Sequence, residues 1–221
     1  MGKLARMART RSIEDGCGIA HATELLGQRW ALLVVRELLL GPKRFTDLRT
    51  GIPDISPNVL GQRLRELEES GIVRRRKLAP PAAAQVYELT DWGRQLEPAL
   101  LALGRWASSS PSFPKGAPMG PDALLLALKS AFDPGKADGL EATYELRLGK
   151  EELPFRIEVS DGRFEAARGE ASEADAVIRS EPDTIAGVVF GGNRLGKAVE
   201  AGDVRIDGRR QAVNSLFRAL S

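Results

Sequence analysis

The sequence contains almost no cysteine and almost no histidine. One residue of each kind, Cys17 and His21, occurs among its 221 residues. A single cysteine excludes a framework of internal disulfide bonds, and a single histidine removes most zinc sites and most histidine-based catalysis. No Ser-His-acid arrangement, metal-ligand spacing or glycine-rich phosphate loop stands out either. We therefore expect a protein that is not an enzyme and that uses neither a metal nor another cofactor.

Long hydrophobic runs are also missing. No apolar stretch approaches the roughly 20 residues that a membrane-spanning helix needs. The start, MGKLARMARTRS, is basic but lacks the apolar segment and the small-residue cleavage site of a secretory signal. The composition, 43% hydrophobic and 28% charged, is typical of a soluble globular protein. We expect a cytoplasmic protein without a membrane partner.

The charge is distributed unevenly along the chain. Residues 1–108 carry 17 Lys and Arg against 12 Asp and Glu, whereas residues 109–221 carry 15 against 18. A basic front half suits contact with a polyanion. The stretch SSSPSFPKGAPMGP is rich in Ser, Pro and Gly and predicts a linker. We expect a basic arm at 1–15, a first domain at 16–108, a linker at 109–121 and a second domain at 122–221.

Two interpretations of the basic arm stay open. Its cations are Lys3, Arg6, Arg9 and Arg11. The first interpretation is a solvated tail, and the alternative is an arm that enters the minor groove of DNA.

The stretch SPNVLGQRLRELEESGIV predicts a helix with two unlike faces. Ser56 can cap its first backbone N–H groups, Pro57 suits its first position, and Gly71 ends it. Its leucines recur at steps of four and three and form a stripe that faces a core: Leu60, Leu64 and Leu67. The opposite stripe holds Asn58, Gln62, Arg65 and Glu69. Asn, Gln and Arg can read base edges, but many surface helices show such a face, so the neighbouring segments must decide.

Those segments indicate a winged helix-turn-helix. ATELLGQRWALLVVRELLLGP predicts a central buried helix that includes Trp30, and RFTDLRTGI predicts a shorter helix before the turn. After Gly71, IVRRRKL and VYEL alternate on either side of a turn and predict a hairpin with a basic strand. This is the order of a winged helix, in which the recognition helix enters the major groove and the wing lies on phosphates.

A further helix follows Thr90, which can cap it. A small first domain does not cover its apolar stripe by itself, so we expect a helix of a second subunit to cover Leu96, Leu100, Leu103 and Trp106. Pro98 falls within this segment and should kink the helix.

With these segments placed, the front half resembles the HxlR family of bacterial winged-helix regulators. The matching stretches are CGIAHATELLGQRWALLVVREL, RFTDLRTGIPDISPNVLGQRLRELEESGIVRR and VYELTDWGRQLEPALLALGRWA, which cover about residues 17–107. The resemblance implies a homodimer that binds double-stranded DNA at a palindromic operator, with the recognition helices about one DNA turn apart. On matching positions, it implies these DNA-contacting residues: Arg44, Thr46, Ser56, Pro57, Asn58, Gln62, Arg63, Arg65, Arg74, Arg75, Arg76 and Lys77.

Cys17 aligns with a cysteine that some regulators resembling this one use for redox sensing. Here Gly18 follows it in place of the usual proline, and the nearby acids Glu14 and Asp15 should disfavour a thiolate. An inert structural cysteine is therefore the first interpretation, with a redox sensor as the alternative.

The back half alternates helices and strands. PDALLLALKSAF predicts a helix, and ATYELRL, FRIEVS and RFEAAR predict strands, the last two joined by a tight turn at Asp161 and Gly162. ADAVIRS and DVRIDG add strands, and RRQAVNSLFRAL closes the chain as a helix. The fold class is therefore α+β: a mostly helical winged helix-turn-helix domain with a β-hairpin wing, followed by an α+β domain with a twisted sheet.

This half resembles the sterol-carrier-protein family over about residues 120–220. The stretches that carry the resemblance are VSDGRF, ADAVIRSEPDTIAGVVFGG and KAVEAGDVRIDGRRQAVNSLFRAL. The resemblance implies a cavity for an apolar molecule between the sheet and its helices. Candidate lining residues, each equally well explained as ordinary core, are Phe155, Ile157, Phe164, Val188, Val189, Phe190, Leu216 and Phe217.

The sequence thus favours a dimeric transcriptional regulator whose second domain binds a hydrophobic small-molecule effector. One alternative is a lipid or hydrophobic-ligand carrier or scaffold that uses the winged helix for protein interaction and dimerisation. A third possibility keeps the regulator and makes the second domain an empty stabiliser of the dimer.

Overall fold

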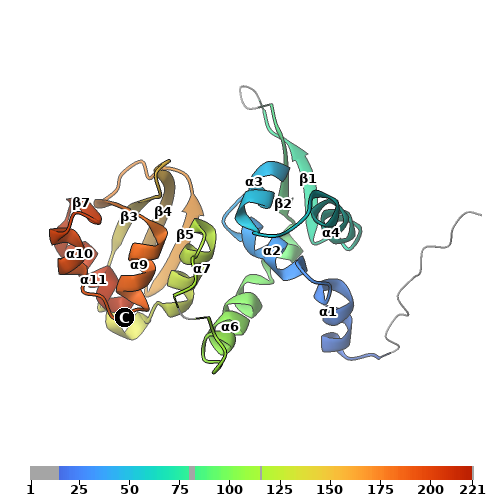
Figure 1. Cartoon of the computed structure of the whole chain (residues 1–221), viewed down its shortest axis with the longest axis horizontal. Coiled ribbons are helices and arrows are strands. Elements are labelled where there is room, and N and C mark those ends of the chain that lie inside the picture. Colours follow the sequence, from blue (N-terminus) through green and yellow to red (C-terminus); the bar gives the residue numbers. More distant parts are fainter. Residues whose placement is uncertain (1–14, 80–82, 115, 221) are drawn as a thin grey trace, which may run out of the picture.

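The computed structural model describes residues 15–79, 83–114 and 116–220. The predicted basic arm lies outside these residues except for Asp15, and so do residues 80–82 of the wing. Figure 1 shows two bodies, one carrying the wing and one built on a larger sheet, which meet where α6 (Glu97–Ser108) and α7 (Pro121–Ala131) lie. The loop between these two helices corresponds to the predicted linker.

The first body is a winged helix-turn-helix domain. Its elements are α1 (Gly18–Leu26), α2 (Ala31–Leu39), α3 (Phe45–Gly51), α4 (Pro57–Glu69), β1 (Val73–Lys77), β2 (Gln85–Leu89), α5 (Asp91–Arg94) and α6. Strands β1 and β2 pair antiparallel from Val73 opposite Leu89 to Lys77 opposite Gln85. The core lies between α2, α3 and α4, where apolar side chains such as Val34, Leu48 and Leu64 are 0–1% exposed.

The predicted central helix is broken into α1 and α2. The chain turns at Gly27, where a Cβ atom would overlap the backbone carbonyl oxygen of Thr23. Trp30 then adopts φ 79° and stands at the start of α2. Trp30 is half-buried against the core rather than enclosed by it, and the guanidinium of Arg29 lies 4.5 Å from the centre of its ring. The break gives α1 a direction of its own, away from α2 (Figure 1).

Pro98 does not kink a helix, which corrects the prediction from the sequence. Thr90 caps the short helix α5 by accepting a hydrogen bond from the backbone N–H of Gly93. The chain then turns, and Pro98 stands in the first turn of α6, where its missing N–H removes no intrahelical hydrogen bond.

The second body is an α+β domain with a five-stranded sheet. Its elements are α7, α8 (Pro134–Ala137), β3 (Ala142–Leu148), β4 (Leu153–Ser160), β5 (Arg163–Arg168), β6 (Ala176–Ser180), α9 (Pro182–Val189), α10 (Leu195–Glu200), β7 (Val204–Gly208) and α11 (Arg210–Ala219). The strand order is β5-β4-β3-β6-β7. Only β3 and β6 pair parallel among these neighbours. Asp161 and Gly162, at φ 50° and 68°, form the predicted tight turn between β4 and β5.

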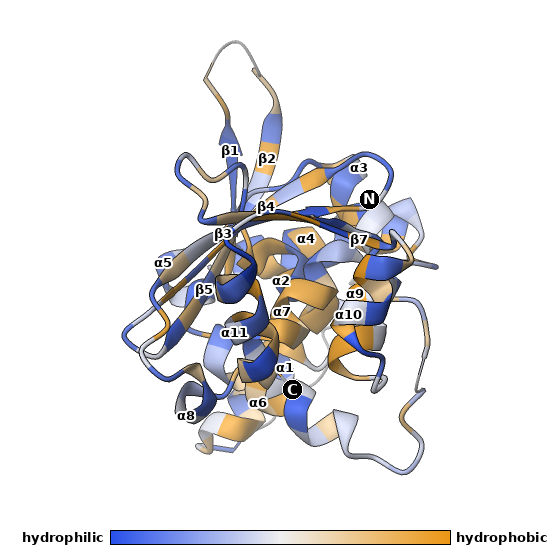
Figure 2. Ribbon diagram, turned by 90° about the vertical axis from the view of Figure 1, so that its left-hand side faces the viewer, coloured by the Kyte–Doolittle hydropathy of each residue, from blue (hydrophilic) through white to orange (hydrophobic). Residues whose placement is uncertain are grey.

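The helices of the second body cover one face of the sheet (Figure 2). Along β4, Phe155, Ile157 and Val159 are buried while Arg156 and Glu158 are exposed, so the strand alternates between core and solvent. Within the ranges that the structure describes, no helix is long and apolar enough to span a bilayer.

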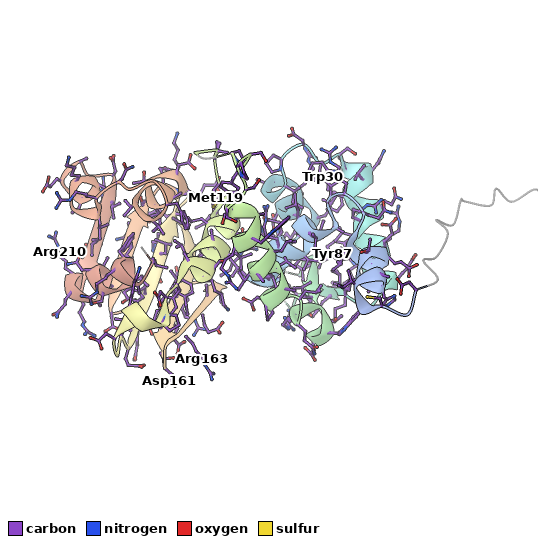
Figure 3. All side chains as sticks on the ribbon, turned by 90° about the horizontal axis from the view of Figure 1, so that it is seen from below. Trp30, Tyr87, Met119, Asp161, Arg163 and Arg210 are labelled. Atoms are coloured by element: carbon purple, nitrogen blue, oxygen red, sulfur yellow. The ribbon has the colours of Figure 1, made fainter. Side chains whose placement is uncertain are left out.

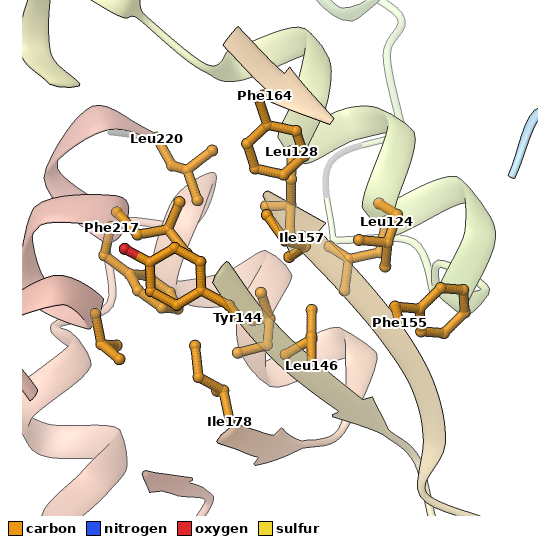
Figure 4. Packing of buried hydrophobic residues seen from close by; sticks show 14 of the residues in the cluster. Leu124, Leu128, Tyr144, Leu146, Phe155, Ile157, Phe164, Ile178, Phe217 and Leu220 are labelled. Carbon is orange, nitrogen blue, oxygen red and sulfur yellow. The ribbon is translucent and has the colours of Figure 1, made fainter. Parts of the chain in front are cut away.

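The residues expected to line an apolar cavity take part in the core. Phe155, Ile157, Phe164 and Phe217 belong to one cluster with Tyr144 (Figure 4), and Tyr144 donates a hydrogen bond of 2.8 Å to the carbonyl oxygen of Ala212. Val188 and Leu216 belong to the same cluster, and Val189 packs against it. Phe190 corrects the prediction: its side chain is 50% exposed because the residue stands at the C-terminal end of α9.

Candidate nucleic-acid interface

Helix α4 presents the polar face that its sequence predicts. The hydroxyl of Ser56 accepts a hydrogen bond of 3.3 Å from the backbone N–H of Val59, and Pro57 occupies the first turn. The side chains of Asn58, Gln62 and Arg65 are exposed, while the leucine stripe on the other side is 0–1% exposed. The exposed side chains can both donate hydrogen bonds to base edges and, for Asn and Gln, accept them.

Arg63 does not share this face, which corrects its place among the predicted DNA-contacting residues. Only 10% of its side chain is exposed, and its guanidinium pairs with the carboxylate of Glu66. Its Nε is buried without a hydrogen bond. The reason is helical geometry: Arg63 follows Leu60 by three residues and precedes Leu67 by four, so it belongs to the buried stripe.

Helix α3 precedes α4 in the sequence, and its start holds two further predicted DNA-contacting residues. Arg44 and Thr46 are exposed, as predicted for residues that contact phosphate. The carboxylate of Asp47 satisfies two hydrogen-bond donors at the start of α3. It accepts hydrogen bonds of 3.2 Å from the backbone N–H of Arg44 and from the hydroxyl of Thr46. Its negative charge reduces the attraction of this helix start for an anion.

The wing carries the predicted basic strand, and carboxylates organise it. Arg74 and Arg76 both donate to Glu88 on β2, at 2.7 and 3.0 Å, and only 7% of the Glu88 side chain is exposed. Arg75 pairs with Glu68 of α4 at 3.1 Å. Burial raises the pKa of Glu88, but the hydrogen bonds from the two arginines outweigh it and hold that pKa below its usual value. Lys77 is exposed at the end of β1.

The predicted dimerisation residues divide between core and solvent. Leu96 and Leu100 pack against the core of the first domain. Leu103 and Trp106 are 44% and 74% exposed, and α6 has no buried residue over its length. Helix α1 also has none, and its Ile19 is 78% exposed. The first domain therefore leaves apolar side chains of both helices uncovered.

A hollow of about 300 Å³ lies between α1 and the segment of α5 and the turn that follows it, and Cys17 directly precedes the α1 residues that line it. Its lining includes His21, Leu25, Trp92 and Leu96. Cys17 is exposed at the N-cap of α1, and the backbone N–H groups of Ile19 and Ala20 lower the pKa of its thiol. This direction is opposite to the one we expected from the neighbouring acids, because the backbone N–H groups at the helix start favour the thiolate.

One group of charged residues was not predicted from the sequence. Glu37, Lys43, Asp122 and Arg168 form a buried cluster where the two domains meet, which we call the interdomain ion cluster. The ammonium of Lys43 contacts the carboxylate of Glu37 and lies 2.9 Å from Oδ2 of Asp122. The guanidinium of Arg168 pairs with the other carboxylate oxygen of Asp122 and lies 3.3 Å from the carbonyl oxygen of Glu37. The exposed fractions of these side chains run from 2% for Glu37 to 24% for Arg168.

Burial dominates the protonation of this cluster. Desolvation lowers the pKa of Lys43, although Glu37 acts in the opposite direction. Desolvation also lowers the pKa of Arg168 to about 10. The one sequence signal for the cluster was Glu37 itself, a carboxylate among the leucines of a helix predicted to be buried.

A second hollow, of about 690 Å³, lies between α9 and α10 of the second domain. It combines an apolar part that includes Val188 and Ala198 with charged side chains, among them Asp183, Arg194 and Lys197. Of the residues that we expected around an apolar cavity, Val188 lines this hollow.

Two family models together match most of the chain. A model described as HxlR-like helix-turn-helix matches residues 25–112, and one described as alkyl sulfatase C-terminal matches residues 117–221. The predicted resemblance of the second domain to sterol-carrier proteins is not confirmed.

Individual relatives match the first domain. The uncharacterized HTH-type transcriptional regulator YvaP of Bacillus subtilis is 38% identical over 94 residues, which are 42% of this chain and 87% of the relative. The HTH-type transcriptional regulator YodB of the same organism is 40% identical over 86 residues, 39% of this chain and 77% of the relative. The solved structure of reduced YodB matches at 36% identity and a TM-score of 0.40, over 43% of this chain and 95% of that chain.

Proposed function

Because this chain belongs to the HxlR-like helix-turn-helix family, we propose that it is a sequence-specific transcriptional regulator that binds operator DNA as a homodimer. The relatives YvaP and YodB are HTH-type transcriptional regulators, which supports a DNA-binding regulator. The observation that carries the proposal is the exposed face of α4, where Asn58, Gln62 and Arg65 stand clear of the core.

The N-terminal half of α4 reads the bases in this proposal. Asn58, Gln62 and Arg65 approach the base edges in the major groove. The acidic side chains Glu66, Glu68 and Glu69 crowd the other half of the helix, and phosphate groups would repel them. This charge distribution tilts the start of α4, and not its end, toward the DNA.

Two basic segments hold the phosphates. Strand β1 offers the row from Arg74 to Lys77, and the start of α3 offers Arg44 and Thr46. Contacts of this kind fix the register of the protein on the duplex and carry no sequence information.

The homodimer is proposed from the uncovered apolar side chains of α1 and α6. Ile19, Leu103 and Trp106 are all exposed by more than two fifths of their surface. A second copy that packs its own α1 and α6 against these residues would bury them and would produce two α4 helices related by a two-fold axis. Such a dimer suits an inverted repeat with half-sites about one DNA turn apart.

We propose further that the second domain binds an apolar effector. The match of residues 117–221 to the C-terminal domain of alkyl sulfatases makes alkyl-chain amphiphiles the first class to test. The hollow between α9 and α10 supports this choice, because Val188 and Ala198 suit an alkyl chain. Arg194 and Lys197 can each pair with an anionic head group, and Asp183 and Asp203 lie in the same lining.

Selection on a randomised pool of duplexes tests the proposed function. The full-length protein is incubated with the pool at near-physiological salt, where non-specific charge attraction fades, and the bound duplexes are sequenced. Enrichment of an inverted repeat is the expected result. Binding without enrichment that disappears as the salt concentration rises would contradict the proposal and favour a carrier or scaffold.

A further inference from the structure

The interdomain ion cluster draws its charges from both domains. Glu37 and Lys43 belong to the winged helix domain, whereas Asp122 lies in the first turn of α7 and Arg168 ends β5. The backbone joins the same contact, because the N–H of Arg168 donates a hydrogen bond of 3.1 Å to the carbonyl oxygen of Leu40. Leu40 is 5% exposed and packs in the core of the second domain. The end of α2 is thus embedded in the second domain.

Lys43 connects this cluster to the DNA-reading elements. It directly precedes Arg44, the N-cap residue of α3. Its backbone also pairs with Tyr87 of β2, since the N–H of Lys43 donates to Tyr87 at 3.0 Å and receives a bond of 2.8 Å in return. A displacement of Lys43 therefore acts on the start of α3 and on the base of the wing.

The other end of α3 touches the cluster as well. A Cβ atom on Gly51, the last residue of α3, would overlap the carboxylate of Glu37, so only glycine permits this approach. Arg36 donates hydrogen bonds both to that carboxylate, at 2.8 Å, and to the carbonyl oxygen of Gly51, at 3.2 Å. Both ends of the helix that precedes α4 are in this way tied to Glu37 and Lys43.

Buried charges hold their geometry only while their partners stay in place. Removing one partner leaves an uncompensated charge away from water, and the remaining groups rearrange or admit water to solvate it. Two of the four charges in the cluster come from the second domain, so the position of that domain decides which arrangement of Lys43 is stable.

We propose that Asp122 and Arg168 are positioning residues for the DNA-binding surface, which they hold in its reading geometry through Lys43. The inference rests on the proposed function and deepens it, because it names the contact through which the second domain acts on DNA binding. A change in the orientation of the second domain shifts Asp122 and Arg168, and α3 and the wing base follow.

Three variants of the full chain test the inference. Asp122→Asn keeps the shape of the side chain and removes its charge, and Lys43→Met removes the charge on the other side. The matched control is Lys129→Met. Lys129 of α7 also pairs between the domains, with Glu97 of α6 at 2.8 Å and with Glu165 of β5 at 2.7 Å, but those partners lie outside α3 and the wing.

The first measurement needs no DNA. Hydrogen exchange of the amides in residues 45–51 is followed by mass spectrometry in the folded wild type and variants. We expect about tenfold faster exchange in Asp122→Asn and in Lys43→Met. The reason is that α3 should open locally more often once its coupling to the second domain is lost. Lys129→Met should leave the exchange of this segment unchanged. Equal exchange of α3 in all four proteins would overturn the inference.

The second measurement uses the duplex that the wild type enriches from the randomised pool. We expect Asp122→Asn and Lys43→Met each to weaken its binding about tenfold and Lys129→Met to bind like the wild type. A fourth variant that combines Asp122→Asn with Lys43→Met should bind no more weakly than either single variant. Unchanged affinity in the two cluster variants, or an equal loss in the control, would overturn the inference. If the wild type enriches no duplex, the proposed function fails, and the exchange measurement still decides whether the cluster positions α3.

Discussion

The Nε of Arg76 donates a hydrogen bond of 3.0 Å to Oε2 of Glu88, and this pair ties the two strands of the wing together. Glu88 has a folded-state pKa below its usual value, so it contributes stability that is complete above its unfolded-state pKa and is lost as the pH falls through the folded-state value.

Glu88→Gln should therefore flatten the acid limb of the stability curve. We expect Glu88→Gln to lower the free energy of unfolding by about 1–3 kcal/mol at pH 7. Between pH 5 and pH 3, the free energy of unfolding should fall less in the variant than in the wild type. Chemical unfolding at each pH measures this. Glu158→Gln, at an exposed position of β4, is the control for the loss of one carboxylate. A parallel decline of Glu88→Gln and wild type would contradict the prediction.

Arg65 and Arg76 should affect DNA binding differently. Arg65→Ala should cost about 1–3 kcal/mol on the enriched duplex and relax one position of the selected sequence, because Arg65 faces the bases in our proposal. Arg76→Ala should weaken binding to all duplexes to a similar degree, because Arg76 contacts phosphate in our proposal. Fluorescence anisotropy on selected and random duplexes separates the two. Equal losses for both variants on both duplexes would remove this assignment of roles.

Trp106→Arg should separate the proposed homodimer. The exposed indole in the last turn of α6 would be replaced by a charge, and we expect the dimer to dissociate at a concentration at least about tenfold higher. Sedimentation velocity over a range of concentrations measures the change. Phe113→Arg places the same charge at another exposed aromatic, in the loop after α6, and should leave the dimer intact. The same shift in both variants, or in neither, would argue against α6 as the interface.

Cys17 should react as a thiol of lowered pKa. The N–H groups at the start of α1 favour the thiolate, so the pH profile of alkylation in the folded protein should have its midpoint below that of the urea-unfolded chain. Iodoacetamide labelling followed by mass spectrometry gives both profiles. A folded-state midpoint equal to or above the unfolded one would show that the helix start does not activate this cysteine.

The hollow of the second domain should distinguish an anionic amphiphile from a neutral one. Arg194→Ala should weaken the binding of decyl sulfate about threefold, which is the scale of an exposed charge pair, and should leave decanol unaffected. Isothermal titration of both compounds measures this, with Arg205→Ala on β7 as the control. Decyl sulfate that binds equally to all three proteins, or to none, would exclude Arg194 from head-group recognition.

The sequence predicted those features that local chemistry determines. Ser56, Pro57 and the leucine stripe define α4 within one stretch of chain, and the turn at Asp161 and Gly162 defines a hairpin in the same way. Arg63 was assigned wrongly because its match to a family position outweighed its place in the buried stripe. The break between α1 and α2 at Trp30 was not predicted. The apolar pattern of the sequence continues through it, and nothing in that pattern indicates that Trp30 adopts a left-handed backbone conformation.

The interdomain ion cluster was beyond such reasoning for a different reason. Lys43 and Asp122 are 79 residues apart in the sequence, and each by itself is an ordinary charged residue next to a proline at a helix or loop boundary. Only the packing of α7 and β5 against the end of α2 brings them together. The same holds for the core of the second domain, where helices and strands were predicted but the close packing around Tyr144 was not.

Because the residues of the interdomain ion cluster are far apart in the sequence, the ribosome makes them at different times. The first domain leaves the ribosome before the second, and Arg168 is made 125 residues after Lys43. At a typical rate of translation this interval lasts roughly 6–25 s. For most of it, once α4 (Pro57–Glu69) has been made, a nascent chain holds α3 and α4 without Arg168 to complete the cluster. In our proposal each newly made copy therefore binds its operator more weakly than the finished protein until synthesis is nearly complete, which favours finished chains on the DNA.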